Sequence, residues 1–149
     1  MNARLAMRMG RATLGLAGAG ALSACSQGAP GSATDALAEC YLTIQKAMVS
    51  VQLAQSETTI TDRVFANQKL NEATRTVIAA WARREGVALT EQDLIDETET
   101  ATTFLNGIDA EAGLSGQALA SEMTEASDHP ELWQAKYNKA LDCAGQAAS

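Results

Sequence analysis

The sequence is poor in histidine and lacks the short motifs that mark common metal, haem and nucleotide sites. His129 is its one histidine, which excludes haem held by two histidines, and no C-x-x-C-H motif is present for covalent haem attachment. The H-E-x-x-H motif of zinc peptidases, the G-x-S-x-G motif of serine hydrolases and the P-loop are absent as well. With no serine or thiol visibly placed beside it, His129 fits a solvated loop residue or a helix cap. We therefore expect no metal, no cofactor and no enzymatic activity.

Proline is also scarce, with two in 149 residues, and no segment alternates apolar and polar residues as a half-buried strand would. Apolar residues instead recur at steps of three and four, among ample Ala, Leu, Gln and Glu. The sequence predicts an all-α domain over residues 35–149, an up-down bundle of four long helices plus one short helix. The predicted apolar faces comprise Leu37, Tyr41, Ile44, Met48 and Val51 in the first helix; Leu70, Ala73, Val77, Ile78 and Trp81 in the second; Leu94, Ala101, Leu105 and Ile108 in the third; and Trp133, Tyr137, Ala140, Leu141 and Ala144 in the last.

Long apolar runs are missing too. The apolar segment near the amino terminus, residues 12–22, carries no charge and is too short for a membrane span, which needs about 20 apolar residues. Arg4, Arg8 and Arg11 precede this stretch, and no acidic residue does. A positively charged start followed by a short apolar segment is typical of a secretory signal peptide.

The four residues that end this segment, Leu22-Ser23-Ala24-Cys25, resemble the lipobox of bacterial lipoproteins. The resemblance implies cleavage after Ala24, removal of residues 1–24, and a diacylglyceryl group on the Cys25 thiol that anchors the protein to a membrane. Two alternatives are an ordinary signal peptide with a chance cysteine and a buried N-terminal helix.

Sorting within the cell envelope depends on the next residue, in the enterobacterial pattern that the resemblance brings. That residue is Ser26 rather than Asp, which favours the outer membrane over the inner membrane. Residues 26–34, rich in Gly, Ser, Pro and Ala, fit a flexible linker between the lipidated cysteine and the folded domain.

Basic residues become scarce once the signal peptide is removed. Residues 1–24 carry three basic and no acidic residues, so the net charge falls from −7 to −10 over the remaining 125 residues. Such a domain repels nucleic-acid phosphates, and it also repels anionic lipid headgroups, so the acyl anchor must hold it to the bilayer. A chain of this length makes one domain, and its charge favours a basic partner protein.

Two cysteines remain beside Cys25, and an even number in an exported chain predicts a disulfide between Cys40 and Cys143. The alternative is a pair of buried, unpaired thiols. A disulfide brings the two Cα atoms within about 7 Å, so the first and last helices must run antiparallel. The short helix near residues 115–126 is then predicted to lie across the end of the bundle opposite the linker.

Residues with helix-ending preferences set the predicted boundaries of these helices. The predicted N-terminal caps are Asp62, Thr90 with Asp93, Ser115, and Asp128 followed by Pro130. Gly86 and Gly113 are the predicted C-terminal ends.

Three groups of side chains are candidates for binding. Trp81, Trp133 and Tyr137 form either a ligand or partner surface or part of the core. The amides Gln45, Gln52 and Gln55, with Asn67, Gln68 and Asn71, form either a polar groove for a partner or ordinary wet surface. The acidic residues of 91–99 form either a hard-cation site or, as we expect, a solvated acidic face.

These features favour a non-enzymatic, membrane-anchored module that faces the periplasm and binds a partner protein, as in envelope assembly, inhibition or immunity to a toxin. The alternative function is a small-ligand carrier with a pocket between helices near Trp81 or Trp133.

Overall fold

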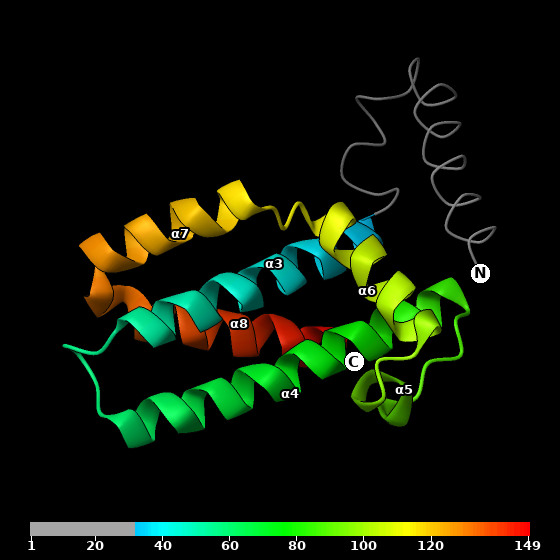
Figure 1. Ribbon diagram of the computed structural model, residues 1–149, viewed down its shortest axis with the longest axis horizontal. Helices are drawn as coiled ribbons and strands as arrows, with labels where there is room; N and C mark the ends of the chain where they lie inside the picture. Colours follow the sequence, from blue (N-terminus) through cyan, green and yellow to red (C-terminus); the bar gives the residue numbers. More distant parts are fainter. Residues whose placement is uncertain (1–31) are drawn as a thin grey trace, which may run out of the picture.

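The computed structural model describes residues 32–149, and every regular element in this part of the chain is helical (Figure 1). The elements are α3 (Ser32–Leu53), α4 (Ile60–Glu85), α5 (Glu91–Ile95), α6 (Glu99–Ala112), α7 (Gly116–Asp128), the short 3₁₀ helix η1 (Pro130–Leu132) and α8 (Trp133–Ala147). The predicted all-α class is confirmed. None of these helices combines the length and the apolar character that crossing a bilayer would require.

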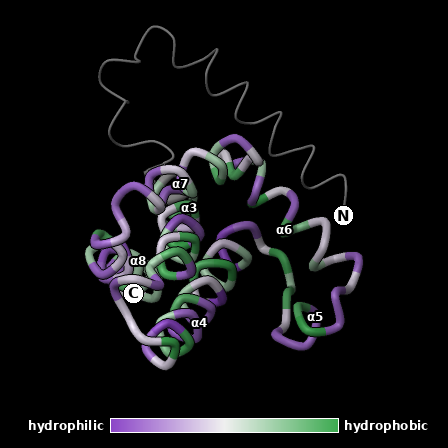
Figure 2. Tube along the Cα trace, turned by 60° about the vertical axis from the view of Figure 1, so that its left-hand side comes forward, coloured by the Kyte–Doolittle hydropathy of each residue, from purple (hydrophilic) through white to green (hydrophobic). Residues whose placement is uncertain are grey.

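Helix α3 lies at the centre of the bundle. It packs against α4 and α8, which also pack against each other, and α7 covers another side of α3 (Figures 1 and 2). Helices α4 and α8 run in the same direction, antiparallel to α3, while α7 runs in the direction of α3. The central position of α3 explains why buried residues recur along almost its whole length.

The core follows the predicted apolar stripes closely. Ile44, Val51, Leu70, Val77 and Trp81 have no exposed surface. In α8 the buried residues of the predicted apolar face are two alanines, Ala140 and Ala144. Their small side chains allow α8 to approach α3 and α4 closely. The stripes missed one large core residue: Phe104 in α6 is 93% buried, with 7% of its surface exposed.

The third predicted helix is in fact two helices. The capping box of Thr90 and Asp93 is present, but α5 ends at Ile95, and Thr98 caps a new helix by accepting a hydrogen bond from the Ala101 amide. Between them Glu97 adopts a φ of 50°, which continues neither helix. The pair α5–α6 lies at the end of the bundle where α3 begins (Figure 1).

The prediction that the helix near residues 115–126 crosses the end of the bundle is wrong. This helix, α7, lies along α3 and returns the chain to the opposite end, where α8 begins. Helices α3 and α8 are nevertheless antiparallel, as the disulfide requires. The segment α5–α6 stays at the end where α4 finishes, so α7 carries the chain back along the bundle and α8 starts from the opposite end.

Several helix ends are confirmed and two are not. Gly86 and Gly113 end α4 and α6 with φ of 66° and 70°, a conformation that glycine adopts without strain, and Ser115 caps α7. Thr59, not Asp62, is the cap of α4, since its hydroxyl accepts a hydrogen bond from the Asp62 amide. Asp128 is the last residue of α7, because the chain enters α8 through the 3₁₀ turn that Pro130 begins.

Candidate functional site

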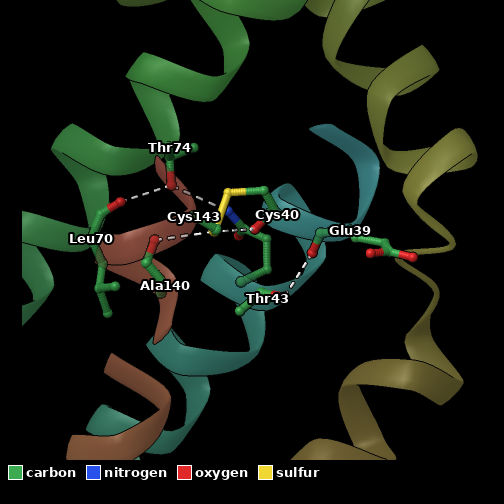
Figure 3. The surroundings of a disulfide bond; sticks show 8 residues. Glu39, Cys40, Thr43, Leu70, Thr74, Ala140 and Cys143 are labelled. Carbon is green, nitrogen blue, oxygen red and sulfur yellow. Dashed lines mark hydrogen bonds between the residues drawn. A yellow bond between two sulfur atoms is a disulfide. The ribbon is translucent and has the colours of Figure 1, made fainter. Parts of the chain in front are cut away.

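The disulfide between Cys40 and Cys143 is present, with the two Cα atoms 5.6 Å apart (Figure 3). It joins the first turns of α3 to the last turns of α8. Beside it, Gln45 donates a hydrogen bond to the Thr74 hydroxyl, which itself donates to the Leu70 carbonyl, so α3 is also tied to α4 at this level. The disulfide therefore stabilises the part of the bundle where the chain enters the folded domain.

The predicted lipidation site, Cys25, lies outside the described residues, as do residues 1–24 and most of the predicted linker. The first described residue of α3 is Ser32 rather than the predicted Asp35. Six residues, 26–31, lie between Cys25 and Ser32 in the sequence, and an extended chain spans at most about 3.3–3.6 Å per residue.

The three candidate aromatic residues do not share a pocket. Trp81 is fully buried in the core, in the last turns of α4. Trp133 and Tyr137 are half-buried in the first turns of α8, with ring centroids 6.2 Å apart. Because α4 and α8 run in the same direction, Trp81 lies at one end of the bundle and Trp133 at the other (Figure 1). Trp81 belongs to the core, and Trp133 and Tyr137 pack against it.

The acidic segment of residues 91–99 is used for local structure. Asp93 closes the capping box, and hydrogen bonds from the Thr90 backbone and hydroxyl lower the pKa of its carboxyl. Asp96 accepts a hydrogen bond from Gln92, and Glu91 pairs with Arg75 of α4 at 3.3 Å. Among residues 32–149 no three acidic, histidine or cysteine side chains are grouped as a metal site would require. The segment forms an exposed acidic face.

His129 is exposed in the turn between α7 and η1. Its Nδ1 atom lies 3.3 Å from the Glu131 carboxylate, and its side chain caps neither neighbouring helix. A solvated loop residue is the interpretation that fits this position.

The candidate amide residues separate into two groups. Gln45 is used between α3 and α4, and Gln52 and Gln55 are exposed near the end of α3. The amides of α4 stay together. Asn67, Gln68 and Asn71 line an open depression on the outer side of that helix, together with Val64, Glu72 and Arg75.

Two features of the surface were not anticipated from the sequence. First, large hydrophobic side chains are exposed at the start of α4, where Ile60, Val64 and Phe65 have 71%, 62% and 56% of their surface accessible. Second, charge is segregated along the chain. Residues 86–135 contain eleven acidic side chains and no lysine or arginine, whereas α4 carries five basic and three acidic residues. A count of charge by helix, rather than over the whole chain, would have revealed the second feature.

Two polar contacts join the outer helices to the core. The Tyr41 hydroxyl of α3 donates a 2.7 Å hydrogen bond to Asp109 of α6. In α7, Glu122 is almost fully buried and accepts a 2.6 Å charged hydrogen bond from Lys136 of α8, which also lies 3.5 Å from Glu125. Apolar periodicity identifies Tyr41 as a core residue but reveals neither contact, because Asp109, Glu122 and Lys136 are charged.

Comparisons of the chain with protein-family models, with curated proteins and with solved structures found no match.

Proposed function

We propose that the chain is an exported lipoprotein, held to a bacterial membrane through acylated Cys25, whose helical domain binds a partner protein in the periplasm without catalysing a reaction. The arrangement of exposed apolar residues carries the proposal. Ile60, Val64, Phe65 and Leu132 are four of the six large hydrophobic side chains that are exposed in the described part of the chain. They lie at the start of α4 or in η1, at the end of the bundle away from the start of α3.

The linker determines which end of the bundle lies near the membrane. A linker of a few residues holds the start of α3 near the bilayer and directs the opposite end of the bundle away from it. Apolar residues grouped at that far end would meet a protein rather than lipid. The order of anchor, short linker and exposed apolar end fits a module that is presented to a partner.

The test has two parts in the native host. Labelling with radioactive palmitate should mark the wild-type chain and not the Cys25→Ser variant, which should leave the membrane fraction. A Ser26→Asp variant serves as the control, because it retains the lipidated cysteine and changes only the residue associated with sorting.

The second part crosslinks living cells that carry a C-terminal tag on the chain. A specific envelope or periplasmic protein should be recovered with the wild-type chain and reduced in the Cys25→Ser variant. An unlabelled chain that remains in the membrane fraction, or a chain that brings no protein with it, would contradict the proposal.

A further inference from the structure

Helix α4 has two opposite faces. Its buried face comprises Ala66, Leu70, Ala73, Val77 and Trp81, at steps of four, three, four and four. A second row, at steps of four, four, three and four, comprises Ile60, Val64, Gln68, Asn71 and Arg75, all of which are exposed. At about 100° per residue the two rows lie on opposite sides of the helix. We call the second row, with its neighbours Phe65, Asn67, Lys69 and Glu72, the outer face of α4.

The outer face has the composition of a contact surface. It is apolar at its start, where Ile60, Val64 and Phe65 are exposed within six residues, and rich in amides further along. Single exposed hydrophobic residues are normal in soluble domains, but three on adjoining turns form a patch that contact with a partner would bury. The amides beyond the patch supply hydrogen bonds that fix the register of such a contact.

One atom of the outer face lacks an interaction that it needs. The Asn67 side-chain oxygen is buried and accepts no hydrogen bond. A buried acceptor without a donor costs about 1–3 kcal/mol, so most such atoms in folded proteins are paired. Asn67 borders the open depression on α4, so a rotation of its amide would bring this oxygen within reach of a donor from another molecule.

Charge indicates what kind of segment the outer face accepts. In a domain that is otherwise strongly acidic, the outer face carries two basic residues, Lys69 and Arg75, and one acidic residue, Glu72. Lys69 and Arg75 form exposed ion pairs with Glu72 and Glu91, and the Lys69 ammonium also lies 5.7 Å from the centre of the Phe65 ring. Exposed pairs contribute little, about 0–1 kcal/mol, so a carboxylate from a partner can replace the present one at small cost.

From these observations we propose that the outer face of α4 binds an acidic amphipathic helix of the partner protein. Apolar residues of that helix cover Ile60 and Val64, a donor reaches Asn67, and carboxylates approach Lys69 and Arg75. A helix is the fitting shape because rows at three- and four-residue spacing accept the matching rows of a second helix. The inference rests on the proposed function and adds the surface and the chemistry of the partner.

A photoreactive amino acid at Gln68, with the same group at Gln117 of α7 as control, tests the location in living cells. Both glutamines are exposed. Crosslinking at position 68 should give one adduct whose crosslinked peptide, identified by mass spectrometry, is acidic and has apolar residues at helical spacing. Position 117 should give no such adduct.

Two substitutions test the chemistry, each with a matched control. Val64→Asp should lower the adduct yield at least about tenfold, as for a residue at the centre of an interface, whereas Ile95→Asp should not, although Ile95 is equally exposed at 63%. Lys69→Glu should lower the yield and Lys139→Glu, with the same change of charge on α8, should leave it unchanged. Circular dichroism should show that all four variants keep wild-type helicity.

Other outcomes overturn the inference in ways that can be told apart. An adduct at position 117 but not at 68 would refute the outer face of α4 and leave the proposed function standing. A basic crosslinked peptide, or an adduct with a second copy of this chain, would refute the acidic helix. Loss of every adduct, together with no protein recovered with the tagged wild-type chain, would refute the proposed function as well.

Discussion

The two halves of the domain are held together by different means. Helices α3, α4 and α8 share a continuous apolar core and a disulfide, and α4 alone buries eight residues. The arm formed by α5, α6 and α7 buries far less apolar surface. No residue of α5 is buried, and α7 buries only Glu122 and Ala126, whereas α6 adds Phe104 and Ile108 to the core.

Outside the buried face of α6, the arm depends on polar interactions to stay in place. Thr90, Thr98 and Ser115 cap its three helices, and one polar contact to the core is made by each of α6 and α7. Local stability follows buried apolar contact, so the arm should open at lower free energy than the core. Caps and polar contacts position α5 and α7, while apolar stripes determine the bundle and the packing of α6.

The largest effect on this comparison should come from the disulfide. Replacing both Cys40 and Cys143 with alanine removes a link that spans 103 residues and encloses nearly the whole domain. In the chain-entropy account, this constraint on the unfolded chain contributes about 4–5 kcal/mol. We expect the free energy of unfolding, measured with urea, to fall by about that amount.

Reduction of the wild-type protein supplies the control for the disulfide. It should lower stability to the level of the double-alanine variant, because both chains lose the same constraint. A wild-type protein whose urea midpoint is unchanged by reduction would show that the core alone holds α3 to α8.

The next largest loss of stability is expected from replacing a leucine of the core, and a leucine of the arm is its comparison. Leu70 is fully buried between α3, α4 and α8, so Leu70→Ala should lower the free energy of unfolding by about 3 kcal/mol, through lost burial and the cavity it leaves. Leu119 of α7 is half-buried, and Leu119→Ala should cost about 1 kcal/mol. Equal losses in urea titrations of the two variants would show that α7 is as firmly packed as the core.

The core was the part that sequence could predict. Rows of apolar residues at steps of three and four identify a helix and its buried face whatever the tertiary structure, and Leu37, Ile44, Leu70 and Trp81 are all buried as expected. The disulfide followed from the parity of the cysteines and the expectation of export. It also fixed the antiparallel relation of the first and last helices.

The arm was predicted less well, for physical reasons. Thr90 was recognised as a cap, but the break at Glu97 requires a left-handed backbone conformation that nothing in the residue type announces. Thr98 had the residue type of a cap, yet within an acidic helical run its hydroxyl gives only a weak signal. Once the third helix was taken as one piece, α7 was misplaced.

The candidate binding surface was only partly foreseen. Asn67, Gln68 and Asn71 were recognised as a possible polar groove, and they do line one depression. The exposure of Ile60, Val64 and Phe65 was not predicted, because an apolar residue beside a helix start is usually assigned to packing. The solvent-facing side of α4 became apparent only when its buried face was known.

Breaking the buried ion pair should loosen the arm specifically. Glu122→Gln removes the charge that faces Lys136, which keeps only part of its surface in water, and leaves the contact to Glu125 in place. We expect a loss of about 2 kcal/mol, less than for a fully buried pair because Lys136 retains one partner. Hydrogen exchange should quicken in α7 more than in α4.

The exposed neighbour provides the matched control for this pair. Glu125→Gln changes the same charge on the same helix, but about half of the Glu125 side chain is exposed, at 52%. Its effect should stay within about 0.5 kcal/mol. If the two variants exchanged equally fast in α7, burial of Glu122 would not be what holds that helix.

The smallest effect should come from the tyrosine that joins the arm to the core. Tyr41→Phe removes the hydrogen bond to Asp109 and should cost about 1 kcal/mol at pH 7, measured by urea unfolding. Tyr137→Phe is the control, since the Tyr137 hydroxyl makes no hydrogen bond to a residue in the described range 32–149, and it should cost less.

The pH dependence of this variant gives a sharper test. Burial, and then the hydrogen bond and the charge of Asp109, raise the pKa of Tyr41 well above its usual value near 10. The folded protein therefore keeps this proton at a pH where the unfolded chain loses it. The contribution of Tyr41 should be complete below about pH 10 and decline above it, because ionisation then favours the unfolded chain. The difference in unfolding free energy between wild type and Tyr41→Phe should shrink from pH 9 to pH 11, and a difference that stayed constant would show that the Tyr41 hydroxyl is not held against α6.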